Sequence, residues 1–160
     1  MAGPVGSLAV RFLDDLGVLW VLAGASAKLW AGSPRLLPEH LRRGLEAADV
    51  LAQEGMTTSV LHVHTIKPLD TEAILDHSVS VPVIVAIEEH TSVGGLGTAV
   101  AEVIAEANFD PGKRFIRIGI PDVFPDEYGS QDSLMERYSI TTQNLVSTVR
   151  RLANMQPRSS

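Results

Sequence analysis

The chain has 160 residues, of which 45% are hydrophobic and 20% charged, a balance typical of one ordinary globular domain. Its formal net charge of −6 argues against nucleic acid as the main partner, because phosphate binding needs clustered Lys and Arg. The chain contains no cysteine, which excludes disulfides, cysteine-based zinc sites and thiol catalysis and is compatible with the cytoplasm.

We expect neither a membrane span nor an export signal. No apolar run approaches the roughly 18 residues of a spanning helix, and the N-terminus lacks the basic start and long apolar core of a secretion signal. The chain is therefore expected to be a single domain, 1–160, with its core over about 8–153 and a frayed tail over 154–160.

In the first part of the chain, strand-like runs precede one amphipathic helix. Two apolar runs separated by Asp-Asp-Leu-Gly predict two strands joined by a turn, and Arg11 places the first at a sheet edge. The irregular segment after them, which contains Trp30, is interpreted as a loop. Leu and Ala at helical spacing then predict a helix that ends at Gly55. The expected elements are strands at Leu8–Leu13, Val18–Ala23 and Thr57–Val63, and a helix at Pro38–Glu54.

The second part of the chain alternates further strands and helices. Its central strand is a β-branched run without polar residues, the pattern of a strand covered on both faces in a parallel sheet. Asp70, Ser130 and Thr141 are expected to cap helices. The expected elements are strands at Val81–Ile87 and Arg114–Ile120, and helices at Thr71–Asp76, Leu96–Ala107, Gln131–Tyr138 and from Thr141 onward.

These elements predict a three-layer α/β/α open sheet of about five strands, mostly parallel, with one antiparallel edge strand. The strand after the first long helix should be parallel to its predecessor through a right-handed crossover. The arginines of Arg114–Ile120 suggest an edge or partner-facing position for that strand.

The loop after the central strand has two interpretations. Glycines at 94, 95 and 97 precede a helix N-terminus, whose N–H groups can bind an anion, so Glu89, His90, Gly94, Gly95 and Gly97 are a candidate anion-binding or interface loop. The full phosphate-loop spacing is lacking, and two carboxylates precede the glycines. We therefore favour glycines required by backbone geometry or close packing over glycines required by a ligand.

Histidines and paired acids near strand ends are candidates for metal or proton-transfer chemistry. His62 and His64 share one strand face, and His77, His90 or the acids Glu88 and Glu89 are the other candidates. No close-spaced ligand motif supports a metal site, and adjacent strand residues point to opposite faces, which separates Glu88 from Glu89. We favour structural roles and predict no catalytic, cofactor or metal residue in this chain.

Four segments carry a resemblance to a known family. The run IEEHTSVGGLGTAVAEVIAE resembles the C-terminal domain of transketolases and the equivalent segment of deoxyxylulose-phosphate synthases. HTIKPLD, RIGIPDVFPDEYGSQDSLMERY and LEAADVLAQEG resemble further segments of that domain in the same order. The chain departs from the family over residues 26–43, where about ten extra residues intervene and Arg42 falls near a position at which the family often has a His.

The resemblance implies a C-terminal domain or subunit of an enzyme that moves a two-carbon ketol unit between sugar phosphates. Thiamine diphosphate and Mg²⁺ are expected in the complete enzyme, held by other domains, and not by this chain alone. The implied partners are thiamine-binding transketolase domains or a subunit, together with a homodimer partner. Exposed aromatic residues at Phe124 and Tyr128, and less so Trp30, are the expected interface.

Two alternatives remain open. One is the C-terminal domain of a related thiamine enzyme, either a 2-oxo acid dehydrogenase β-subunit or a deoxyxylulose-phosphate synthase. The other is a free-standing module that binds a small anion at the carboxyl ends of its strands, the usual ligand position in open α/β sheets.

Overall fold

The computed structural model describes residues 8–10, 18–23, 39–63, 65–124 and 129–154. In chain order its elements are β1 (Leu8–Val10), β2 (Val18–Ala23), α1 (Glu39–Gln53), β3 (Thr58–Val63), α2 (Thr71–Ser78), β4 (Val83–Thr91), α3 (Leu96–Glu106), β5 (Arg114–Ile120), α4 (Gln131–Arg137) and α5 (Thr142–Asn154).

The five strands form one sheet in the order β1-β3-β2-β4-β5. β2, β3, β4 and β5 run parallel, and β1 pairs antiparallel with β3 at one edge. The predicted fold class is confirmed, including the antiparallel edge strand, and so is the edge position of the arginine-bearing β5. β1 and β2 are not a hairpin, however, because β3 lies between them.

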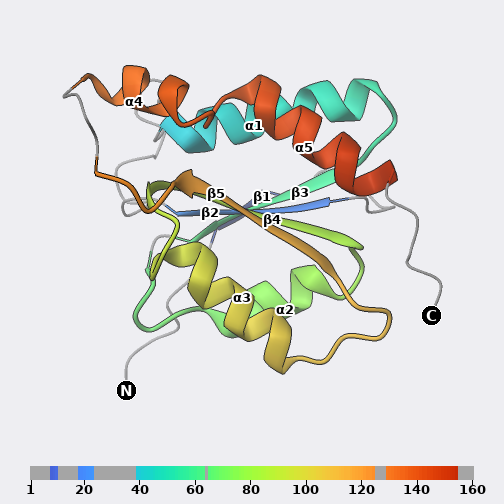
Figure 1. Ribbon diagram of the computed structural model, residues 1–160. Coiled ribbons are helices and arrows are strands. Elements are labelled where there is room, and N and C mark those ends of the chain that lie inside the picture. Colours follow the sequence, from blue (N-terminus) through green and yellow to red (C-terminus); the bar gives the residue numbers. More distant parts are fainter. Residues whose placement is uncertain (1–7, 11–17, 24–38, 64, 125–128, 155–160) are drawn as a thin grey trace.

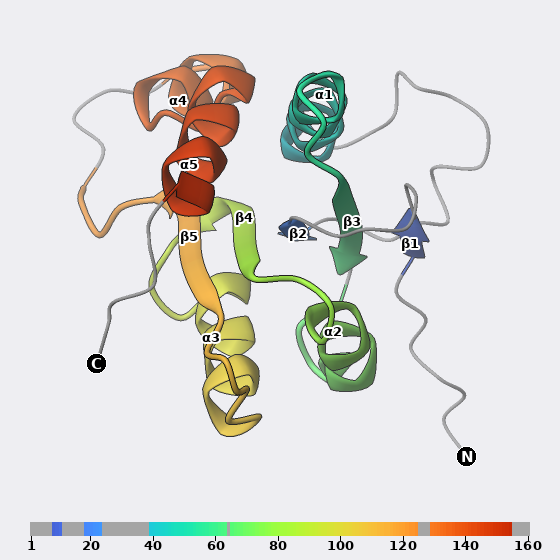
Figure 2. The same ribbon diagram turned by 90° about the vertical axis from the view of Figure 1, so that its right-hand side faces the viewer.

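Helices cover both faces of this sheet (Figure 1). α1, α4 and α5 lie on one face, and α2 and α3 lie on the other. The view along the strands shows the same three layers (Figure 2). None of the helices in the described ranges is both long and apolar enough to cross a membrane.

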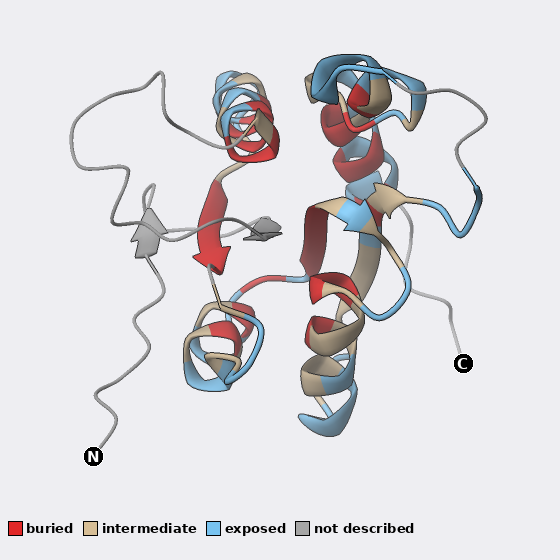
Figure 3. Ribbon diagram, turned by 90° about the vertical axis from the view of Figure 1, so that its left-hand side faces the viewer, coloured by how far each residue is buried: buried red, intermediate tan, exposed pale blue. Residues whose placement is uncertain are grey.

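The side chains of β4 divide the core into two clusters. Val83, Val85 and Ile87 pack against α1 and α5, whereas Ile84 packs against α2 and α3. This alternation follows from the two-residue period of a strand. Burial is therefore continuous along the first part of β4, as the absence of polar residues in this run predicts (Figure 3).

The predicted helix caps are confirmed. Asp70 accepts a hydrogen bond from the N–H of Ala73, Ser130 from that of Ser133 and Thr141 from that of Asn144. Each satisfies one of the N–H groups that the first turn leaves without a partner. β4 is longer than predicted, because it continues through both acids and His90 to Thr91.

A buried arginine joins the helices of one layer. The side chain of Arg43 on α1 is only 8% exposed, and it donates to Glu39 and to the carbonyl oxygen of Ile140 at 2.7 Å. Ile140 lies in the turn between α4 and α5. Arg43 therefore fixes this turn against α1.

Replacing Arg43 with Leu should lower the free energy of unfolding by roughly 1–3 kcal/mol, because the buried carbonyl of Ile140 loses a charged donor. The matched control is Arg42→Leu, since Arg42 is 45% exposed and pairs with Glu39 and Glu46 on the surface. That change should cost about 0–1 kcal/mol. Urea unfolding of both variants measures the difference, and equal losses would contradict the role assigned to Arg43.

Candidate functional site

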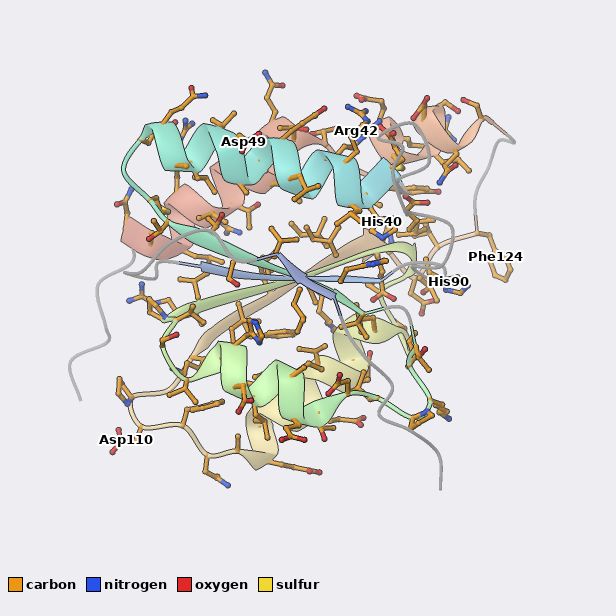
Figure 4. All side chains as sticks on the ribbon, turned by 180° about the vertical axis from the view of Figure 1, so that it is seen from behind. His40, Arg42, Asp49, His90, Asp110 and Phe124 are labelled. Carbon is orange, nitrogen blue, oxygen red and sulfur yellow. The ribbon has the colours of Figure 1, made fainter. Side chains whose placement is uncertain are left out.

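The carboxyl ends of the parallel strands bring the candidate residues together. Figure 4 places His40, His90 and Phe124 at one end of the sheet, with Asp110 at the opposite end. β2 and β4 are neighbours, but the chain leaves β2 toward β3 and leaves β4 toward β5. This divergence is the position at which open α/β sheets usually bind ligands.

Glu88 of β4 caps helix α3. The residue is buried, and its carboxylate accepts hydrogen bonds from the N–H groups of Leu96 at 2.9 Å and Gly97 at 3.0 Å. Gly95 at the N-cap has no side chain to do this. A negative charge at this position is also favoured by the helix dipole.

Close contacts explain two of the glycines. A Cβ on Gly95 would lie 1.9 Å from Glu88 Oε2, and one on Gly97 would lie 2.7 Å from Arg117 Cγ. Gly94 has a φ of +74°, a left-handed conformation that residues with a Cβ rarely adopt. The contacts agree with close packing and backbone geometry as the reason for the glycines.

The same cap bears on the anion interpretation of the loop. The N–H groups that an anion would use at the start of α3 already bind a carboxylate of the protein. An added phosphate would have to displace Glu88 and would be repelled by its charge. The geometry therefore disfavours an external anion at these two groups.

Glu89 forms hydrogen bonds with the helices on the opposite face of the sheet from α3. Its Oε1 accepts hydrogen bonds from the backbone N–H of His40 at 2.8 Å and from His40 Nδ1 at 2.5 Å, and its Oε2 accepts one from Gln131. His40 lies in the first turn of α1 and Gln131 begins α4. One carboxylate thus connects β4 with two helices.

The charge of Glu89 is stabilised by these contacts. Burial alone would raise its pKa, but the hydrogen bonds and electrostatic attraction from His40 and the hydrogen bond from Gln131 outweigh burial. The pKa therefore lies below its ordinary value of 4.5. Glu88 and Glu89 bind opposite layers, as their adjacent positions in a strand predict, and they are not a cooperating acid–base pair.

The histidines in the described ranges belong to no metal-binding group. His62 is buried in β3, His77 donates from Nδ1 to the carbonyl of Ala73 at 2.8 Å, and His90 is exposed. His64 lies outside the described residues. Within the part of the chain that the structure describes, no three His, Asp or Glu side chains are grouped so that they could hold a metal ion.

His40 is the residue of this region that sequence analysis missed. Its side chain is 4% exposed, and its contact with Glu89 spans 49 positions in sequence. The resemblance directs attention to Arg42 instead, which is exposed and ion-paired with Glu39 and Glu46. The sequence signal for His40 is only its position beside the first apolar residue of a predicted helix. A local pattern of this kind does not identify Glu89, on a distant strand, as the partner of His40.

Of the predicted interface residues, Phe124 lies within the described structure. It is 97% exposed in the segment that follows β5, and its neighbour Val123 is 53% exposed. Tyr128 and Trp30 lie outside the described residues. Phe124 is therefore accessible to a partner.

The fold and this strand edge define the class of protein: an open, mixed α/β domain whose strand-end acids are used to hold helices on both faces. Residues 39–145 match the family model described as the C-terminal domain of transketolase. The chain belongs to this family.

Several known proteins contain a similar domain. A putative transketolase C-terminal section of Methanocaldococcus jannaschii is 35% identical over 69% of this chain and 33% of its own length. A 1-deoxy-D-xylulose-5-phosphate synthase of Syntrophotalea carbinolica is 34% identical over 68% of this chain and 17% of its own length. The chain thus spans a third or less of these relatives.

Solved structures agree with the assignment. A structure described as a split gene transketolase, inactive beta4 tetramer, superposes with a TM-score of 0.72 and 26% identity over 94% of this chain and 43% of that chain. The transketolase of Campylobacter jejuni superposes with a TM-score of 0.56 and 14% identity, over 93% of this chain and 19% of that chain, a likeness of fold alone.

Adding a methyl group at Gly95 should displace the Glu88 carboxylate and break its bonds to α3. We expect Gly95→Ala to lower the free energy of unfolding by about 1–3 kcal/mol, and Gly97→Ala by less, because Arg117 is exposed and can move. Gly112→Ala is the control, since its Cβ would contact nothing within 4 Å. Thermal unfolding that leaves Gly95→Ala as stable as Gly112→Ala would contradict the packing explanation.

Glu89 should make stability depend on pH. Because its folded pKa lies below its ordinary value of 4.5, its contribution is present above that value and is lost as the pH falls through the folded pKa. Glu89→Gln should therefore be less stable than the parent near neutral pH, and the difference should shrink in acid. Urea unfolding from about pH 7 to about pH 3 tests this, and a constant difference would refute it.

Proposed function

We propose that this chain is the C-terminal part of a transketolase-type enzyme and serves its assembly. The complete enzyme would transfer a two-carbon ketol unit between sugar phosphates. Thiamine diphosphate and Mg²⁺ would be bound by other domains or by a second chain. The acidic, cysteine-free composition fits an enzyme of the cytoplasm.

This proposal rests mainly on one observation. At the carboxyl ends of the strands, where open α/β sheets usually bind ligands, the backbone N–H groups of the helices bind carboxylates of the protein itself. Glu88 occupies the N-terminus of α3, and Glu89 binds the first turn of α1. These residues do not fit a diphosphate, because two carboxylates stand where its charge would lie. The described residues also offer no grouped ligands for Mg²⁺.

The names of the relatives support a role as part of a larger assembly. One relative is named a transketolase C-terminal section, and another, from Clostridium sp., is named a subunit of a 6-deoxy-6-sulfo-D-fructose transketolase. The split gene transketolase is described as an inactive beta4 tetramer. We infer that this chain assembles with thiamine-binding parts and with a second copy of itself as a homodimer.

A second candidate is the C-terminal part of a deoxyxylulose-phosphate synthase. Relatives with this name reach 34% identity in Syntrophotalea carbinolica and 38% in Heliobacterium modesticaldum. This identity is comparable with that of the relatives named as transketolases. The two candidates share the assembly role and differ in the reaction of the complete enzyme.

The purified chain should bind neither thiamine diphosphate nor Mg²⁺, and it should have no ketol-transfer activity. From its source, it should co-purify with a polypeptide that binds thiamine diphosphate. Calorimetry tests the first expectation, and affinity purification followed by mass spectrometry tests the second. A saturable thiamine diphosphate isotherm for the chain alone would overturn the proposed function. So would a preparation from the source in which no polypeptide, whether separate from this chain or continuous with it, binds thiamine diphosphate.

The choice between the two reactions is made on the recovered complex. Ketol transfer between sugar phosphates would support the transketolase assignment. Formation of 1-deoxy-D-xylulose 5-phosphate would support the synthase. Because the two assays detect different products, a single preparation is enough for both.

A further inference from the structure

Most exposed apolar side chains of the described residues lie at the carboxyl ends of the parallel strands, here called the carboxyl edge of the sheet. Five large hydrophobic residues are exposed in the described ranges. Four of them follow the carboxyl ends of parallel strands: Ile66 after β3, Val93 after β4, and Val123 and Phe124 after β5. The fifth, Val79, precedes β4 at the opposite edge.

Hydrogen bonds connect the loop after β4 with β5. The N–H of Ser92 donates to the carbonyl of Ile120 at 2.7 Å, which ties the loop of Val93 to the end of β5. The guanidinium of Arg117 donates to the carbonyl of Ser92 at 2.8 Å. The loop of Val93 and the end of β5 therefore belong to one hydrogen-bonded surface.

Phe124 has the properties of an anchor for a partner. It is 97% exposed, so its ring gains little from burial within the domain, and Val123 beside it is 53% exposed. Large aromatic side chains that enter a partner's pocket are the usual centres of interface energy. Exposed apolar groups in one region commonly mark such a contact surface.

The direction of β1 indicates what covers this edge. β1 is antiparallel, and its first residue, Leu8, pairs with His62, one residue before the end of β3. The polypeptide therefore enters the sheet at the carboxyl edge. In the relatives, the matching region is a third or less of a longer chain, and one relative is itself named a transketolase C-terminal section. Their preceding parts would approach a domain of this topology from that edge.

We propose that the carboxyl edge of the sheet is the docking surface for the thiamine-binding part of the enzyme, with Phe124 as its anchor and Val93 and Val123 at the same edge. The proposal rests on the proposed function and names the surface through which that function is performed. The partner must present an apolar pocket that accepts an aromatic ring. Val79, at the opposite edge, stays in water.

The experiment compares single charges placed on the two edges. Phe124→Asp and Val93→Asp alter the proposed surface, and Val79→Asp is the matched control, because Val79 is 66% exposed and Val93 is 56% exposed. The probe is the thiamine-binding polypeptide that co-purifies with the parent chain. Calorimetry measures its affinity for each variant, and thermal unfolding verifies that each variant is folded.

Phe124→Asp and Val93→Asp should each weaken the affinity about tenfold or more, and Val79→Asp should leave it within about twofold. Equal affinity for all three variants, or an equal loss in Val79→Asp, would overturn the docking surface while the proposed function stands. If no thiamine-binding polypeptide accompanies the parent chain, both the function and the surface are overturned.

Discussion

The structure depends on two successive carboxylates near the carboxyl end of β4, an interior strand of the sheet. Glu88 points to one face of the sheet and holds the first N–H groups of α3. Glu89 points to the other face and holds the start of α1 together with Gln131 of α4. A strand turns successive side chains to opposite faces, so two neighbouring residues can fix both helical layers. Each negative charge also lies where a helix dipole favours it.

These two contacts help to explain the glycines after β4 and the position of Arg43. The glycines after β4 leave room for the Glu88 carboxylate, since a Cβ on Gly95 would overlap it. On the opposite face, Arg43 extends the connection from α1 to the turn between α4 and α5. The paired acids, which in isolation suggest acid–base chemistry, thus serve as internal helix caps.

Much of the architecture could be predicted because it depends on local patterns. The apolar run of β4, the amphipathic α1 and the capping residues Asp70, Ser130 and Thr141 are all set by near neighbours in sequence. The pairing of β1 with β3 and the contact between His40 and Glu89 are set by residues far apart in sequence. Periodicity carries no information on such contacts, so they were missed or left undetermined.

The capped N-terminus of α3 and the exposed apolar loops at the carboxyl edge have one physical explanation. An open α/β sheet places helix N-termini around the point where its strand order diverges, and these termini attract anions. Here that attraction is satisfied by the protein's own acids, which leaves no free N–H group at Leu96 or Gly97. The loops at this edge also carry exposed apolar residues. Such an edge is suited to contact another protein, since apolar side chains are buried favourably against a partner surface that is itself apolar.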